Sequence, residues 1–172
     1  NFVSQVIVQS NKRGQTYKEI AKTHDYLLVY AKSELGEIKE LERTGGFPTK
    51  DDKGGYELRE LRNRNPKFGR FNRPNLFYPI YVDPTKKDKD GLLPISLEKS
   101  KQYSVEVLPL NSMGDESCWR WGKEKARATI DENARVSDVV AKMKTTSEFG
   151  IYEKYRKETY KAKSIWLESE VI

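Results

Sequence analysis

LRELRNRNPKFGRFNRPNLFYPIYV, residues 58–82, is the stretch from which the fold of this chain is best predicted, because a dense basic run changes there into an aromatic, strand-like run. Six cations fall within fifteen residues, opposed only by Glu60: Arg59, Arg62, Arg64, Lys67, Arg70 and Arg73. The β-branched and aromatic residues 75–82 predict a strand. Pro79 removes one ladder donor, so we expect this strand at a sheet edge or a bulge.

The basic half of this stretch admits two interpretations. Arginine and asparagine carry planar donors that read purine edges in a major groove or grip phosphates. Asn63, Asn65 and Asn72 lie among the arginines, which favours contact with nucleic acid. The alternative is a solvated loop whose arginines cover the apolar strand that follows.

Strand patterns dominate the rest of the chain. Residues 2–9 and 24–32 are compact apolar runs typical of strands, and a long, mobile, polar loop is expected between them. That loop carries Lys12 and Arg13, with Gly14 as its turn. Short strands are also expected at 92–96 and 103–108, and a β-hairpin should pair 136–144 with 148–157.

Helices are expected at two places only. Residues 35–42 predict a short helix, and residues 116–133 predict a longer one with Asp115 or Ser117 as its N-cap. Trp119 and Trp121 would then point about 200 degrees apart. Residues 56–61 fit a short strand or a helix equally well. The predicted fold class is α+β, with mixed, mainly antiparallel strands and hairpins and a few helices.

Composition limits the functional classes. The chain has 172 residues, 36% hydrophobic and 34% charged, with a net charge of +6, which suits one polar domain, or a small domain plus an extension, with polyanionic partners. One cysteine and one histidine exclude a disulfide framework and a cysteine or multi-histidine zinc site. No apolar run approaches the roughly 20 residues that span a bilayer, and no signal peptide is evident. We therefore expect a cytoplasmic protein.

Catalytic motifs are absent from the sequence. There is no glycine-rich phosphate loop, no Gly-x-Ser-x-Gly elbow and no paired-histidine metal motif. We expect His24 to play a structural, hydrogen-bonded part, since it has no evident nucleophile as partner. Cys118 is expected to be a buried, inert thiol; the alternative is a thiol activated by the start of the 116–133 helix.

Several blocks in order resemble the middle of the class beta DNA amino-methyltransferases, especially the modification subunits of type III restriction systems. The blocks are NFVSQVIVQSNKRG and THDYLLVYAKS near the start, then NRPNLFYPIYVDP, WRWGKEKA and KAKSIWL. The resemblance covers nearly the whole chain. It implies a bacterial enzyme that transfers a methyl group from S-adenosylmethionine to adenine after flipping the base out of double-stranded DNA.

The resemblance also implies a domain organisation. Residues 1–35 would be a remnant of the catalytic sheet, residues 36–160 the target recognition domain, and residues 161–172 the return to the catalytic domain. The family's Asp-Pro-Pro-Tyr and Phe-x-Gly-x-Gly motifs do not occur in the sequence. The chain is therefore expected to be an excised middle segment of a larger enzyme, without a catalytic, cofactor-binding or metal site of its own.

The expected DNA-binding residues fall into three groups. Arg70, Asn72 and Arg73 are expected in a groove, Arg59, Arg62, Arg64 and Lys67 on phosphates, and Lys12 and Arg13 on the backbone beside the flipped base. Expected partners are double-stranded DNA, a second copy of the chain and a restriction subunit. The alternatives are a dimerisation or subunit-docking module of the same enzyme, and an independent nucleic-acid-binding module.

Overall fold

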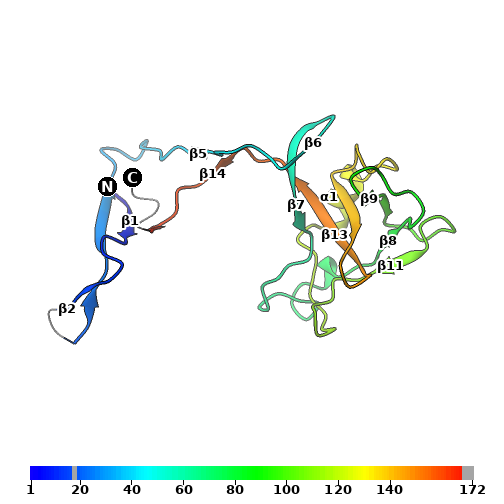
Figure 1. The fold of residues 1–172 in the computed structure, drawn as a ribbon, viewed down its shortest axis with the longest axis horizontal. Coiled ribbons are helices and arrows are strands. Elements are labelled where there is room, and N and C mark those ends of the chain that lie inside the picture. The colour runs from blue at the N-terminus through cyan, green and yellow to red at the C-terminus, as the bar shows by residue number, and fades with distance from the viewer. Residues whose placement is uncertain (17–18, 168–172) are drawn as a thin grey trace. The chain divides into compact units, whose positions relative to one another are not determined.

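The computed structural model describes residues 1–16 and 19–167 and divides the chain into two compact units. Unit 1 comprises Asn1–Thr44 and the chain from Glu158 onward, and unit 2 comprises Gly45–Lys157. Strands are much more common than helices in both units (Figure 1), and the predicted α+β, mainly antiparallel fold is confirmed. The described residues form one α-helix, α1 (Lys123–Thr129), and one 3-10 turn, η1 (Pro74–Leu76), and neither is long and apolar enough to cross a membrane.

Unit 2 is built on a five-stranded sheet in which every neighbouring pair is antiparallel. Its strand order is β6 (Thr49–Asp51), β7 (Gly54–Glu60), β13 (Phe149–Tyr155), β12 (Val139–Met143) and β9 (Leu92–Leu93). The predicted hairpin of 136–144 with 148–157 is confirmed by β12 and β13. Residues 56–61, which fitted a strand or a helix, fall mainly in strand β7.

A second sheet of unit 2 has three antiparallel strands, with β8 (Ile80–Val82) between β10 (Ile95–Ser96) and β11 (Val105–Val107). The strand predicted over 75–82 is therefore only half correct, because its first residues form the turn η1. Pro79 immediately precedes the central strand β8, where its missing donor disturbs no ladder. Its expected position at an edge or a bulge is wrong.

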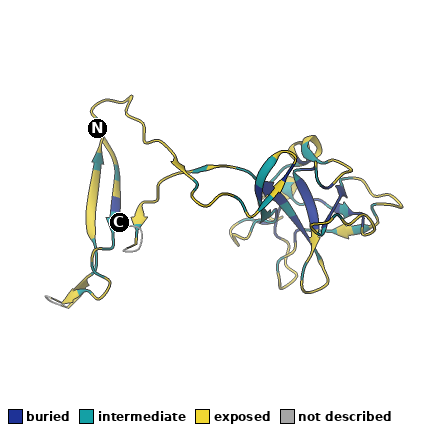
Figure 2. Cartoon of the chain, turned by 45° about the horizontal axis from the view of Figure 1, so that its top comes forward, coloured by how far each residue is buried: buried dark blue, intermediate teal, exposed yellow. Residues whose placement is uncertain are grey.

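The two sheets of unit 2 share one core. Buried residues gather in this unit (Figure 2), and the main cluster draws on both sheets and on the segment before α1: Leu61, Tyr78, Ile80, Val82, Leu93, Ile95, Trp119, Val139, Ala141 and Ile151. Val140 faces the other side of β12 and packs with Tyr56, Leu92 and Ala134. Apolar side chains therefore pack on both faces of the five-stranded sheet at β12.

The helix predicted over 116–133 is correct only over its middle, because α1 begins at Lys123 with Gly122 as its N-cap and ends at Thr129. Residues 117–120 are not helical, and three of their four backbone N–H groups donate to distant carbonyls. Ser117 N donates to Pro109 O at 2.9 Å, Trp119 N to Leu76 O at 2.8 Å and Arg120 N to Leu61 O at 2.9 Å. Tertiary pairing therefore overrides helix propensity here, and Trp119 and Trp121 do not lie on a helix.

Unit 1 contains a three-stranded sheet in which β1 (Phe2–Val8) lies between β4 (Asp25–Tyr30) and β15 (Ile165–Trp166). β1 and β4 confirm the strands predicted at 2–9 and 24–32. The expected loop between them contains a small hairpin, β2 (Gln15–Thr16) with β3 (Ala21–Lys22).

The helix predicted over residues 35–42 is wrong. Leu41–Glu42 forms strand β5 and pairs with β14 (Thr159–Tyr160). Leu35 and Ile38 are exposed, so a helix here would have no surface on which to bury its apolar face. So short a helix is not stable without such packing.

Candidate nucleic-acid interface

The basic loop, residues 62–76, connects the two sheets of unit 2 and is anchored at both ends. At its start, Asn63 N donates to Cys118 O at 2.8 Å, and Ser117 Oγ donates to Asn63 O at 2.6 Å. At its end, Leu76 O accepts from Trp119 N. Trp119 itself is fully buried and donates from Nε1 to Tyr78 O at 2.7 Å. Segment 117–120 thus holds both ends of the loop against the core.

Asparagine side chains hold the interior of the basic loop. Asn63 Oδ1 accepts from Asn65 N at 3.0 Å, and Asn65 Oδ1 accepts from Lys67 N at 3.0 Å. Asn72 Oδ1 accepts from Gly69 N at 3.1 Å, while its Nδ2 donates to Lys67 O at 2.8 Å. These bonds replace the ladder that a strand would offer the backbone. The asparagines expected to accompany base contacts therefore already give the loop its shape.

Four cations of the basic loop are exposed: Arg64, Lys67, Arg70 and Arg73. The side chain of Arg64 is 78% exposed, and Arg70 lies over the ring of Phe77 with Cζ 4.9 Å from the centroid. Arg73 lies over Phe68 at 5.1 Å. Of the seven residues predicted in 59–73 to bind DNA, six lie on this short, anchored loop, and Arg59 lies on strand β7.

Arg59 and Arg62 are held more closely than the other cations of the stretch. Arg59 Nε donates to Glu57 Oε1 at 2.7 Å, and its guanidinium stacks on Tyr155, 3.3 Å from the ring centroid. The side chain of Arg62 is only 18% exposed and donates to Glu60. Arg59 therefore covers an aromatic ring as well as carrying charge, and Arg62 is held by an acid close to the sheet.

Three acids oppose the cations, whereas the sequence indicated only Glu60. Glu57 is two residues from Arg59, a spacing that places both on one face of β7. Glu116 accepts from Arg70 Nη1 at 2.7 Å from 46 residues away, a contact that no local pattern reveals. Burial alone would raise the pKa of Glu60, but the hydrogen bonds and charges of Arg64 and Arg62 outweigh it and leave that pKa lowered. Glu60 therefore remains charged.

A hollow of about 220 Å³ lies behind the basic loop, with Arg73 and Arg120 among its lining residues. Arg120 was not singled out from the sequence, and its Nη2 donates to Glu153 Oε1 at 2.7 Å. Cys118 also lines the hollow, is buried, and has a pKa raised by desolvation against the opposing charge of Arg73. The expected burial of Cys118 is confirmed, and activation by a helix start is excluded because α1 begins five residues later.

Lys12, Arg13 and His24 belong to unit 1. Lys12 and Arg13 are exposed on a turn closed by Asn11, whose Oδ1 accepts from Arg13 N at 3.1 Å and Gly14 N at 3.2 Å. His24 Nε2 lies 3.1 Å from the Tyr26 hydroxyl, which agrees with a hydrogen-bonded role. Among residues 1–16 and 19–167, no three His, Cys, Asp or Glu side chains come together as metal ligands.

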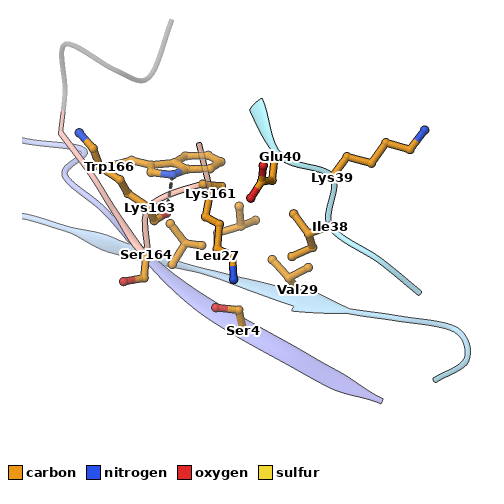
Figure 3. Close-up of a pocket in the computed structure, with 12 residues that line it drawn as sticks. Ser4, Leu27, Val29, Ile38, Lys39, Glu40, Lys161, Lys163, Ser164 and Trp166 are labelled. Carbon is orange, nitrogen blue, oxygen red and sulfur yellow. Dashed lines mark hydrogen bonds between the residues drawn. The ribbon is translucent and has the colours of Figure 1, made fainter. Parts of the chain in front are cut away.

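A larger hollow in unit 1, about 490 Å³, has mainly apolar walls (Figure 3). Leu27 and Val29 of β4, Ile38 and Trp166 approach the same space, and Trp166 Nε1 donates to Lys163 O at 2.9 Å. Lys39, Glu40, Lys161 and Lys163 also line the hollow, so charged side chains border its apolar walls.

Comparison with known proteins relates the chain to a methyltransferase. It is 33% identical over 138 residues to the Type II methyltransferase M.KpnI of Klebsiella pneumoniae. The aligned part is 74% of this chain and 30% of the relative, so the chain spans about a third of that protein's length. No protein-family model and no solved structure match. The expected relationship to methyltransferases is thus confirmed at this level.

Proposed function

We propose that this chain is the DNA target-recognition region of a site-specific, S-adenosylmethionine-dependent DNA adenine methyltransferase of the restriction-modification type. Recognition falls to residues 36–160, most of which lie in unit 2, while residues 1–35 are a remnant of the catalytic sheet and residues 161–172 lead back to the catalytic domain. The relationship to a methyltransferase supports this assignment. The cofactor and the catalytic motifs belong to the parent enzyme.

The observation that carries the proposal is the preorganised basic loop. Its backbone is fixed by the amides of Asn65 and Asn72 and by segment 117–120. Binding therefore orders little chain, and a rigid loop loses less entropy than a mobile one. The loop offers guanidinium groups, which bind guanine and phosphate in a bidentate manner.

The roles of the cations follow from their exposure. Arg70 and Arg73 are proposed as groove contacts, with Asn72 supporting them, since both of its amide atoms already bind the loop. Lys67 is proposed to contact a phosphate, with Arg59, Arg62 and Arg64 as weaker contributors because each is paired with an acid of β7. Lys12 and Arg13 are proposed to hold the DNA backbone beside the flipped base.

Salt-dependent binding of the 172-residue chain to fluorescent double-stranded DNA tests the proposal. Lys67→Ala should weaken binding to every sequence and flatten the plot of log affinity against log salt by about one unit, because one phosphate contact is lost. Arg73→Ala should instead relax the preference at one base pair. Lys101→Ala, an exposed lysine outside the loop, is the matched control. No DNA affinity at low salt, or equal losses for Lys67→Ala and Lys101→Ala, would contradict the proposal.

A second candidate function, dimerisation or subunit docking, is favoured by unit 1. Its strands β1 and β4 expose large apolar side chains, among them Phe2, Tyr26, Leu28 and Tyr30. Sedimentation of the chain at low and high salt distinguishes the two functions, because an apolar dimer persists at high salt while DNA binding does not. The resemblance favours a type III modification subunit, whereas the relative has a Type II name. Co-purification of the parent enzyme with a restriction subunit would support type III.

A further inference from the structure

Phe71 is exposed at the tip of the basic loop. Its side chain is 77% exposed, and it is the one exposed aromatic residue of unit 2, all of whose residues the structure describes. Phe68 and Phe77 of the same stretch are half-buried and lie under arginines. Single exposed apolar side chains are common on protein surfaces, and what sets Phe71 apart is that its aromatic ring lies among the exposed cations of the basic loop.

The backbone beneath Phe71 is fixed. Asn72 N and Arg73 N both donate to Gly69 O, at 3.2 and 2.8 Å, which closes a tight turn with Arg70 and Phe71 at its tip. A Cβ on Gly69 would lie 2.6 Å from Glu116 O and 3.1 Å from two ring atoms of Phe71. The ring thus leans on the α-carbon of a glycine that the fold requires, and its direction is set before any partner binds.

The surroundings of Phe71 define the chemistry of the partner. The ring lies between Arg70 and Arg73 in sequence, with Lys67 and Arg64 on the same loop. A partner that fits this loop presents negative charge on both sides of an apolar, flat surface. Duplex DNA does so where a base step is opened, because phosphates then flank base faces against which an aromatic ring can pack.

We propose that Phe71 is a wedge that enters double-stranded DNA between adjacent base pairs while the cations of the basic loop bind the flanking phosphates. Apolar side chains inserted in this way partly unstack a base step and kink the duplex. The inference rests on the proposed DNA-recognition function. It adds a position at which deformability of the DNA, and not hydrogen bonding to base edges, contributes to selectivity.

A comparison of two short labelled duplexes tests the wedge. One is fully paired, and the other carries a central mismatch, at which unstacking costs less. The 172-residue chain should bind the mismatched duplex more tightly. Phe71→Ala should weaken binding about tenfold, from the loss of one base–aromatic contact, and abolish the mismatch preference. The salt slope should stay unchanged because no charge is removed, and Phe71→Leu should retain part of the preference.

Met113→Ala is the matched control, since Met113 is 82% exposed in the same unit and lies outside the loop. Circular dichroism verifies that each variant is folded. If the chain binds both duplexes with normal salt dependence and Phe71→Ala matches the wild type, the wedge is overturned while the proposed function stands. If the folded wild-type chain binds neither duplex at low salt, both are overturned.

Discussion

Lys154 Nζ lies 2.9 Å from Asp51 Oδ2 in the interior of unit 2, joining strands that are 103 residues apart in sequence. The Lys154 side chain has no solvent exposure, and its other two donors bind Ala134 O at 2.8 Å and Arg135 O at 2.9 Å. Asp51 also accepts two hydrogen bonds from Arg156, at 2.9 and 2.7 Å. This cluster of hydrogen bonds and ion pairs fastens β6 and the loop before β12 to β13. Lys154 and Arg156 are therefore structural cations.

Asp51→Asn should destabilise the chain by about 3–5 kcal/mol, because it leaves a buried ammonium without its counter-charge. The measurement is the free energy of unfolding in urea. Asp52→Asn is the control: its carboxylate is exposed and pairs with Arg135 at the surface, so the change should stay within about 0.5 kcal/mol. Similar losses from the two variants would show that the buried pair is not a major source of stability.

The contribution of Asp51 should depend on pH in one direction. Burial by itself would raise the pKa of Asp51, but the hydrogen bonds from Arg156 and Lys154 outweigh it and hold the pKa well below its usual range. A carboxyl whose pKa is depressed on folding stabilises fully above its unfolded pKa, about 3.9, and loses that stabilisation as the pH falls further. The gap in unfolding free energy between the wild type and Asp51→Asn should therefore shrink below about pH 4. A gap that widens on acidification would reverse the sign of this argument.

Cys118 should resist thiol reagents in the native state. Its side chain is buried, and burial raises its pKa, so both access and the thiolate fraction are low. Ellman's reagent at neutral pH should react at a rate set by unfolding, and urea should release the reaction. A rapid reaction with the folded chain would mean that the hollow behind the basic loop opens to solvent. The loop's anchors at Asn63 and Leu76 would then have to be reconsidered.

The local pattern of the sequence predicts most of the strands but not the contacts that shape the interface. The alternation of apolar and polar residues is sufficient to predict β1, β4 and the β12–β13 hairpin. Each of these strands is a clear apolar run or pairs with the next strand along the chain. The segment 117–120 has helix-forming neighbours, yet two of its backbone N–H groups donate to the carbonyl oxygens of Leu61 and Leu76, which are distant in sequence. Such pairing has no local signature.

The same limit applies to the basic loop. Six cations in fifteen residues indicated a site for nucleic acid, but the sequence did not indicate which of the six are free to bind DNA. That depends on Glu116, which binds Arg70 from 46 residues away, and on Tyr155, which stacks under Arg59. The sequence did not predict that Phe71 is exposed, because an aromatic residue within a basic run is as easily assigned to the core. Its exposure is a property of the folded turn.

Glu60 forms ion pairs with cations of the basic loop, and removing its negative charge should strengthen DNA binding. Its carboxylate accepts from Arg62 Nε at 3.1 Å and Arg64 Nε at 2.7 Å, with Lys144 Nζ at 3.9 Å. In Glu60→Gln, Arg64 is released to contact phosphate, so affinity should rise. The log–log salt slope should steepen by about 0.9 for each added phosphate contact. Fluorescence anisotropy with duplex DNA over a range of salt measures both quantities.

Glu98→Gln makes the same change in net charge at an exposed position outside the loop and serves as the matched control. If net charge alone governs binding, the two variants should gain equally, because long-range attraction depends little on where one charge is removed. If Glu60 acts by holding Arg64, only Glu60→Gln should steepen the slope. A weaker complex in Glu60→Gln would instead mean that the Glu60 pairs orient the arginines for binding, and that their restraint is part of the recognition surface.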